Sequence, residues 1–175
     1  MDFDLSEEQR LLKESVDGLL GNERTGIARV GVSKERLRRI RDLASKVESG
    51  GKPIIQDAAF RDKLAACEIE LKALELTQLR VVADEGKHGK GKPNPASSVL
   101  KIKGSEIQQT TTELLMEVIG PFAAPYDVHG DDGSNEAMDW TAQIAPSYFN
   151  NRKVSIYGGS NEIQRNIITK AVLGL

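Results

Sequence analysis

The chain has 175 residues, and 24 Lys and Arg against 26 Asp and Glu give it a formal net charge of −2. This length suits one domain. The near balance of charge gives no electrostatic reason to expect nucleic acid or an acidic membrane surface as a partner. Hydrophobic residues make up 39% and charged residues 29%, which excludes a wholly disordered chain.

A single cysteine, Cys67, excludes an internal disulfide and a cysteine-based zinc cluster. It falls on an apolar helical stripe, so we expect it to be packed rather than reactive. No run of 18 apolar residues occurs, and the sequence therefore predicts no membrane span. The first residues, MDFDLSEEQR, are too acidic for a secretory or mitochondrial leader. A cytoplasmic location is expected.

Apolar residues recur at helical spacing along most of the chain. Ser6 and Gln9 form a capping box at the first helix, Gly50 and Gly51 end the second, and Pro95 suits the start of the fourth. The predicted helices cover about residues 6–20, 23–48, 54–85, 95–118, 146–151 and 160–175. No alternating pattern is long enough for a sheet, so we expect an all-α fold, an antiparallel helical bundle.

The helices are long for a chain of this size, and their apolar faces predict association with other subunits. In the third helix the predicted stripe is Phe60, Leu64, Cys67, Leu71, Leu74 and Val81 or Val82. In the fourth it is Val99, Ile102, Ile107, Leu114, Leu115 and Val118. In the last it is Ile163, Ile167, Ile168, Val172 and Leu173.

The sequence Gly158-Gly159-Ser160 comes directly before the last amphipathic helix. Free backbone N–H groups and the helix dipole at such an end suit an anion such as a phosphate, and glycines allow a ligand to approach the backbone. An ordinary Ser cap, closed by Glu162 or Gln164, explains the same residues and is favoured by the chemistry alone.

Glu23 and Arg24 stand at the head of the second predicted helix. A carboxylate there would act as a general base if apolar surroundings raised its pKa toward neutrality. The simpler interpretation is an acid in a first helical turn, stabilised by the dipole.

Other candidate sites are weak. Residues 86–93 resemble a phosphate-binding loop, but Pro93 replaces the metal-binding hydroxyl, and a solvated basic loop is favoured. His88 and His129 lie in predicted polar loops without metal-ligand spacing. The acidic stretch that begins at Asp127 lacks the glycine and glutamate of a calcium loop. We therefore predict no metal site.

Three stretches resemble the acyl-CoA dehydrogenase family. MDFDLSEEQRLLKESV is similar to the family's first helix, and ERTGIARVGVSKERL to the opening of its carboxyl-terminal helical domain. IYGGSNEIQRNIITKAVLG is similar to that domain's last loop and helix. The resemblance implies an amino-terminal helix fragment at residues 1–20 and a C-terminal four-helix-bundle-like domain at residues 21–175. The family's middle β-domain is missing between Leu20 and Gly21.

The chain also departs from the family pattern. Many members place the catalytic glutamate where this chain has Gly158, which cannot remove a proton. A minority carry the base where Glu23 aligns, followed by an arginine, here Arg24. Ser160 matches a hydroxyl that commonly contacts FAD, and Glu162 stands where glutamine is common. The family's Arg-x-x-Phe-Gly segment is not found in GGKPIIQDAAFRDKL.

The resemblance implies flavin-dependent α,β-dehydrogenation of an acyl-CoA thioester, as in fatty acid metabolism. It implies Glu23 as base, FAD as cofactor, and Gly158, Gly159, Ser160 and Glu162 as cofactor-binding residues. The implied partners are an acyl-CoA substrate, an electron-transfer acceptor and a homo- or hetero-tetramer. The alternative is a non-catalytic helical assembly module or an inactive subunit of a dehydrogenase complex.

Overall fold

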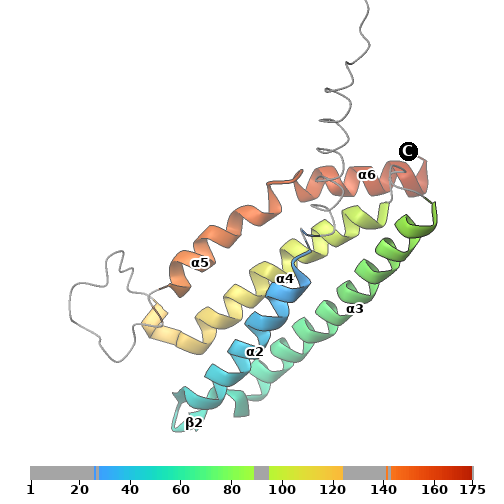
Figure 1. Ribbon diagram of the computed structural model, residues 1–175. Helices are drawn as coiled ribbons and strands as arrows, with labels where there is room; N and C mark the ends of the chain where they lie inside the picture. Colours follow the sequence, from blue (N-terminus) through green and yellow to red (C-terminus); the bar gives the residue numbers. More distant parts are fainter. Residues whose placement is uncertain (1–25, 27, 89–94, 124–140, 142, 175) are drawn as a thin grey trace, which may run out of the picture.

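The computed structural model describes residues 26, 28–88, 95–123, 141 and 143–174 of the chain. Helices dominate this part, and Figure 1 shows them packed side by side as a bundle. The α-helices are α2 (Val30–Lys46), α3 (Ala58–His88), α4 (Pro95–Ile119), α5 (Ile144–Asn151) and α6 (Asn161–Leu173). The prediction of an all-α helical bundle is confirmed.

Helix α4 is the central element and contacts α2, α3, α5 and α6. In Figure 1, α2 and α3 lie on one side of α4, while α5 and α6 follow one another along its other side. Ion pairs fix the directions: Lys63 at the start of α3 pairs with Glu117 near the end of α4, so the two helices are antiparallel. Arg165 of α6 pairs with Glu106 of α4. Helices α5 and α6 together therefore form the fourth side of the bundle.

Burial of aliphatic side chains holds α2, α3 and α4 together. The buried cluster is made by Ala28, Val30, Leu37, Ile40, Ala44, Phe60, Leu64, Cys67, Leu71, Leu74, Val81, Leu100, Ile107, Leu114, Leu115, Val118, Ile119, Ala123 and Ile144. The stripe predicted on the third helix is confirmed with Val81 rather than Val82, which is exposed. On α4 the predicted stripe is buried except for Val99, which is also exposed.

The second predicted helix is interrupted near its head. Arg29 has a φ of 44°, and this left-handed conformation ends regular helical geometry. Helix α2 begins only at Val30. Its other end comes two residues earlier than predicted: α2 ends at Lys46, and Val47 is extended. Gly50 and Gly51 both take positive φ angles and form a tight turn further on, rather than the end of the helix. The turn joins two short strands that the sequence did not predict, β1 (Glu48–Ser49) and β2 (Lys52–Pro53), which pair antiparallel.

The third predicted helix begins later and ends later than expected. Ile54–Gln56 form a 3-10 turn, η1, and the Asp57 carboxylate accepts a hydrogen bond of 2.8 Å from the Phe60 N–H group. This is helix capping, so α3 starts at Ala58. The helix continues to His88, and the prediction of a loop at that residue is therefore wrong.

The remaining boundaries are close to those predicted. A 3-10 turn, η2 (Gly120–Ala123), follows α4, and α5 begins two residues before Pro146. The first predicted helix, over residues 6–20, lies outside the described residues.

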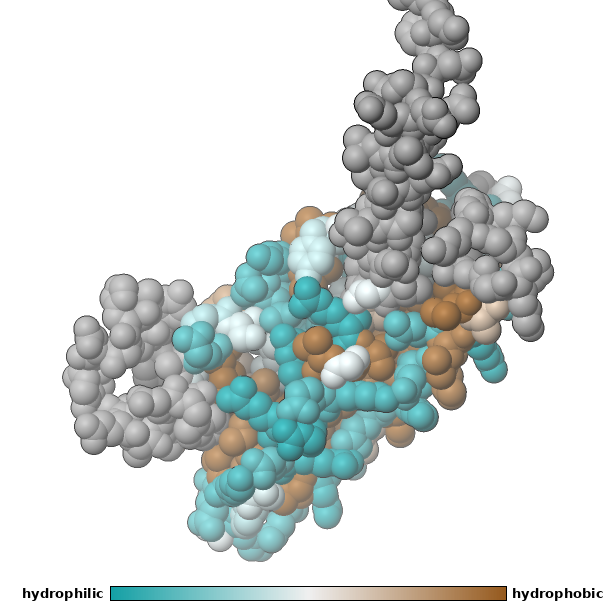
Figure 2. Space-filling model, viewed as in Figure 1, coloured by the Kyte–Doolittle hydropathy of each residue, from teal (hydrophilic) through white to brown (hydrophobic). Residues whose placement is uncertain are grey.

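Helix α6 carries its apolar side chains mainly on the surface. Ile163, Ile167, Val172 and Leu173 are exposed, and Ile168 is half-buried. Helix α3 likewise has a second apolar stripe opposite its core-facing one, with Ile69 at 71% exposure followed by Leu76 and Leu79. Figure 2 shows hydrophobic patches among the hydrophilic surface on one face of the bundle.

Candidate functional site

The glycine turn predicted as a ligand site connects the two halves of the bundle's fourth side. A 3-10 turn, η4 (Arg152–Ser155), continues from α5, and residues 156–160, called here the 156–160 turn, lead into α6. Gly158 and Gly159 have φ angles of 68° and 83°, which strongly favour glycine. The Gln164 side-chain amide donates to the Gly158 carbonyl oxygen at 3.3 Å and closes the turn.

Ser160 caps α6, as the sequence predicts. Its Oγ accepts from the Ile163 N–H group at 3.4 Å, and its carbonyl oxygen accepts from the Gln164 N–H group at 3.0 Å. The Glu162 carboxylate is held at the same helix end. Hydrogen bonds from its own backbone N–H group and from Ser160 lower the pKa of Glu162 from its usual value. Glu162 therefore stays ionised and competes for the donors at this end.

A buried polar network joins the turn to α4. The Lys101 ammonium group donates to the Ser155 carbonyl oxygen at 2.8 Å and to Asn161 Oδ1 at 2.7 Å. The Asn161 side-chain amide in turn donates to Ser105 Oγ at 3.1 Å. Burial lowers the pKa of Lys101, and the Glu162 carboxylate opposes that shift. This network links both ends of the 156–160 turn to one turn of α4.

The head of α2 lies against the same stretch of α4. Gly104 is so close to Ala28 that a Cβ atom built on the glycine would lie 2.6 Å from Ala28 Cα. Lys101 and Gly104 are three residues apart, within one helical turn. Half-buried Arg36 of α2 interacts electrostatically with Arg29 and Tyr157, and its pKa is lowered mainly by burial. Ala28, just before α2, and the two ends of the 156–160 turn therefore contact the same stretch of α4.

Among the predicted site residues, the structure brings Gly158, Gly159 and Ser160 of the 156–160 turn together with Glu162 of the first turn of α6. Glu23 and Arg24 lie outside the described residues. The same applies to His129, to residues 89–94 of the basic stretch and to the acidic stretch from Asp127 to residue 138.

Sequence reasoning missed Lys101 and Asn161 because it looked for apolar stripes. Lysine is almost never fully buried, yet the exposure of Lys101 is 2%. The sequence does carry a signal for a buried polar face of α4, because polar residues recur along this helix at intervals of three and four. These buried residues are Ser98, Lys101, Ser105, Gln108 and Thr112.

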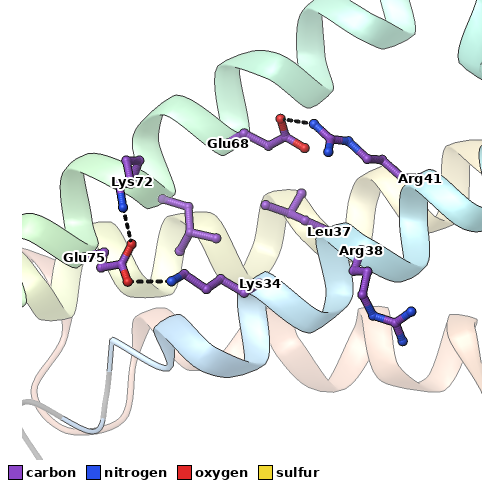
Figure 3. A pocket seen from close by; sticks show the side chains of 8 residues that line it. Lys34, Leu37, Arg38, Arg41, Glu68, Lys72 and Glu75 are labelled. Atoms are coloured by element: carbon purple, nitrogen blue, oxygen red, sulfur yellow. Dashed lines mark hydrogen bonds and ion pairs between the residues drawn. The ribbon is translucent and has the colours of Figure 1, made fainter.

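A separate pocket of about 310 Å³ opens between α2 and α3. Leu37 and Leu71 are its apolar lining residues, and Figure 3 shows Leu37 among charged side chains from both helices. Glu75 pairs with both Lys34 and Lys72, whose hydrogen bonds lower the pKa of the Glu75 carboxyl. Glu75 is therefore unsuited to donate a proton near neutral pH. None of the predicted site residues lines this pocket.

Cys67 is buried, as predicted, and burial raises its pKa to about 11. Within residues 28–84, 95–123 and 143–174, no three His, Cys, Asp or Glu side chains are grouped so that they could hold a metal ion. None of the helices described is both long and apolar enough to cross a membrane.

The 156–160 turn has donors that fit a phosphate-bearing cofactor. Gly158 and Gly159 are exposed, so their backbone is open to a ligand. Asn161 and Glu162 contribute backbone N–H groups at the positive end of a 13-residue helix, and Ser160 adds a hydroxyl group. The donor chemistry therefore fits an anion such as the phosphates of a dinucleotide, in competition with the Glu162 carboxylate.

The sequence was compared with models of known protein families. The family model of the acyl-CoA dehydrogenase C-terminal domain matches residues 14–173. No curated protein matches the chain in sequence.

Solved structures of larger proteins share the fold. The ChsE4–ChsE5 complex from Mycobacterium tuberculosis is 25% identical, with a TM-score of 0.62 over 82% of this chain and 34% of that chain. A glutaryl-CoA dehydrogenase from Mycobacterium smegmatis in complex with FADH2 is 19% identical, with a TM-score of 0.67 over 89% and 37% of the two chains. A glutaryl-CoA dehydrogenase in complex with glutaryl-CoA is 20% identical, with a TM-score of 0.70 over 91% and 37%. This chain thus spans about a third of their length.

Proposed function

This chain belongs to the acyl-CoA dehydrogenase family, and on that premise we propose that it takes part in flavin-dependent α,β-dehydrogenation of an acyl-CoA thioester. The observation that carries the proposal is that the residues just before α2 and the start of α6 both contact one turn of α4. Ala28 packs against Gly104, and Asn161 binds Lys101. Glu23 lies five positions before Ala28, which supports a shared site for this acid and the 156–160 turn.

In this proposal Glu23 is the general base that removes the α-proton of the thioester. A positioned carboxylate typically contributes about 10²–10⁴-fold to such a step. Arg24 is a structural neighbour of the site. Glu23 takes this role because Gly158 occupies the position of the glutamate that many family members use, and glycine has no group to accept a proton.

The 156–160 turn and the start of α6 hold FAD in the proposed complex. The N–H groups and hydroxyl of Gly158, Gly159, Ser160 and Glu162 line the flavin or its phosphates. When bound, FAD supplies the redox chemistry by accepting hydride from the β-carbon. The protein's own part is to orient the two ligands and to remove the proton at the α-carbon.

The decisive experiment replaces Glu23 by Gln in the chain loaded with FAD. Turnover of acyl-CoA with an artificial electron acceptor should fall by at least about 10²-fold, while the bound flavin is retained. Glu35→Gln is the matched control, because Glu35 is an exposed acid paired with Arg38 on α2, and it should leave turnover unchanged. Unchanged turnover in Glu23→Gln would exclude Glu23 from the mechanism.

The remaining features of the proposal concern partners. We propose an acyl-CoA substrate, an electron-transfer acceptor and assembly into a homo- or hetero-tetramer, in the cytoplasm and without nucleic acid. Exposed apolar side chains on α3 and α6 support assembly, because adjacent apolar groups on a surface are typical of interaction sites.

The same exposed stripes favour a second candidate, a non-catalytic assembly module or inactive subunit. Flavin absorbance of the purified chain discriminates the two: a yellow protein supports the enzyme, whereas a colourless oligomer in light scattering supports the module. The intact mass of the natural protein tests whether a middle domain accompanies this chain.

A further inference from the structure

Lys101 carries a buried ammonium group whose two hydrogen-bond acceptors, on Ser155 and Asn161, are both neutral. Its exposure is 2%, and within the described part of the chain no carboxylate forms an ion pair with it. A buried charge without a direct ion pair is costly even when it is hydrogen-bonded, and the nearby Glu162 carboxylate offsets this cost only in part, because burial still lowers the pKa of Lys101. An apolar side chain would fill the same position at lower cost, so stability alone does not account for a lysine there.

The two acceptors of Lys101 lie on either side of the 156–160 turn. Ser155 is the last residue of η4, and Asn161 is the first residue of α6. One ammonium group, with hydrogen bonds of 2.8 and 2.7 Å, therefore ties the two ends of the turn to α4. Two of the five residues between these ends are glycines with positive φ angles.

Asn161 is itself held in a fixed orientation. Its Nδ2 group donates to Ser105 Oγ at 3.1 Å, and the Ser105 hydroxyl donates to the Ile102 carbonyl oxygen at 2.8 Å. These bonds hold the Asn161 side chain with its Oδ1 toward Lys101, and the same oxygen also lies 3.2 Å from Ser105 Oγ. Asn161 is buried, and the network is shielded from water, which strengthens each bond.

We propose that Lys101 is a positioning residue that holds the 156–160 turn in the conformation that receives FAD, acting through Ser155 and Asn161. The inference rests on the function proposed above for this turn. A glycine-rich turn has many conformations available to it, and ordering such a turn on binding costs affinity. The Lys101 network orders the turn before the ligand arrives. Its positive charge behind the start of α6 also has the sign that favours an anionic ligand.

The test measures FAD affinity in the full chain by quenching of flavin fluorescence. Lys101→Met keeps most of the side-chain volume and removes both hydrogen bonds, and it should weaken FAD binding at least tenfold. Asn161→Ala removes one of the two links and should weaken binding about fivefold. Lys103→Met is the control, because Lys103 pairs with Glu70 and Glu106 at the surface, and it should leave the affinity within twofold.

The double variant Lys101→Met/Asn161→Ala separates positioning from a general loss of stability. If Lys101 acts through Asn161, the double variant should bind FAD about as weakly as Lys101→Met alone, because the second change removes a link that is already broken. Multiplicative losses would overturn the inference, as would unchanged affinity in a folded Lys101→Met chain. If Lys101→Met does not fold, unchanged affinity in Asn161→Ala overturns it.

Hydrogen exchange of residues 156–160 tests the positioning role of Lys101 independently of the proposed function. A wild-type chain that does not bind FAD overturns the proposed function. In that case faster exchange of the turn in Lys101→Met than in Lys103→Met still supports the positioning role, whereas equal exchange overturns it.

Discussion

Ala28 and Gly104 are in direct backbone contact, because the glycine has no side chain to separate the two segments. The nearest Ala28 atom to a Cβ built on Gly104 is the α-carbon, at 2.6 Å, and the Ala28 carbonyl oxygen follows at 3.1 Å. Distances below 3.0 Å to backbone atoms require the backbone to move. This contact determines how closely the residues just before α2 pack against α4.

We predict that Gly104→Ala destabilises the protein by about 1–3 kcal/mol, as overpacking of a core does. Gly31→Ala is the matched control. Gly31 also lies in a helix, but nothing lies within 4 Å of the position that a Cβ atom would take there, so the change should stabilise by about 0.5 kcal/mol. Urea unfolding of the two variants measures the difference. Equal stability of the two would contradict the close contact.

The Asp57 carboxylate caps α3, and its loss should destabilise the helix. The cap bond to the Phe60 N–H group is 2.8 Å long, and Phe60 is among the most buried side chains. Asp57→Ala should lower the free energy of unfolding by about 1 kcal/mol. Asp57→Asn should retain most of it, because asparagine caps helices about as well. Thermal unfolding followed by circular dichroism checks both, and an equal loss in the two variants would argue against a capping role.

Cys67 should be inert toward thiol reagents in the folded protein. Burial raises the pKa of the Cys67 thiol to about 11, and only the thiolate reacts. Relative to an ordinary thiol with a pKa of about 8.5, the reactive fraction near pH 8 falls by about two orders of magnitude. Ellman's reagent should therefore label Cys67 slowly in buffer and rapidly in urea. Fast labelling in buffer would show that the α3 stripe opens.

Glu75 should give the protein stability that is lost in acid. Hydrogen bonds from Lys34, and then from Lys72, lower the pKa of Glu75 in the folded state. A depressed carboxyl pKa stabilises the fold above the unfolded-state pKa, and this stabilisation is lost as the pH falls through the folded-state pKa. Glu75→Gln should therefore be less stable than wild type near neutral pH, with the difference shrinking in acid.

Urea midpoints at about pH 7 and about pH 3, on either side of the usual glutamate range, measure this difference. Glu48→Gln is the control, since Glu48 is exposed on β1. A difference between Glu75→Gln and wild type that persists in acid would mean that the ion pairs do not carry the effect.

Helical periodicity was sufficient to predict most of the fold. Leucines and isoleucines at intervals of three and four mark faces that are buried because long helices must cover one another, as at Leu37, Leu71 and Leu114. The break at Arg29 could not be predicted this way. It accompanies the contact between Ala28 and Gly104, which joins residues far apart in sequence and leaves no local pattern.

The candidate site was predictable only in part, for a related reason. Ser160 and the two glycines before it follow a local rule for helix starts, and the structure has them as expected. Lys101 reaches Asn161 across the bundle. The role of Lys101 depends on a partner that only tertiary packing brings close. The residues next to Lys101 and Asn161 in the sequence do not indicate that the two side chains meet.

The central place of α4 has a consequence for how the chain folds. Besides its sequential neighbours α3 and α5, helix α4 contacts α2 and α6, which are not adjacent to it in the chain, so each of these two pairings closes a long loop. Contacts of high sequence separation slow folding, even in a helical protein. We therefore expect slower, more cooperative folding than in a bundle of sequential hairpins, with no independently stable half that omits α4.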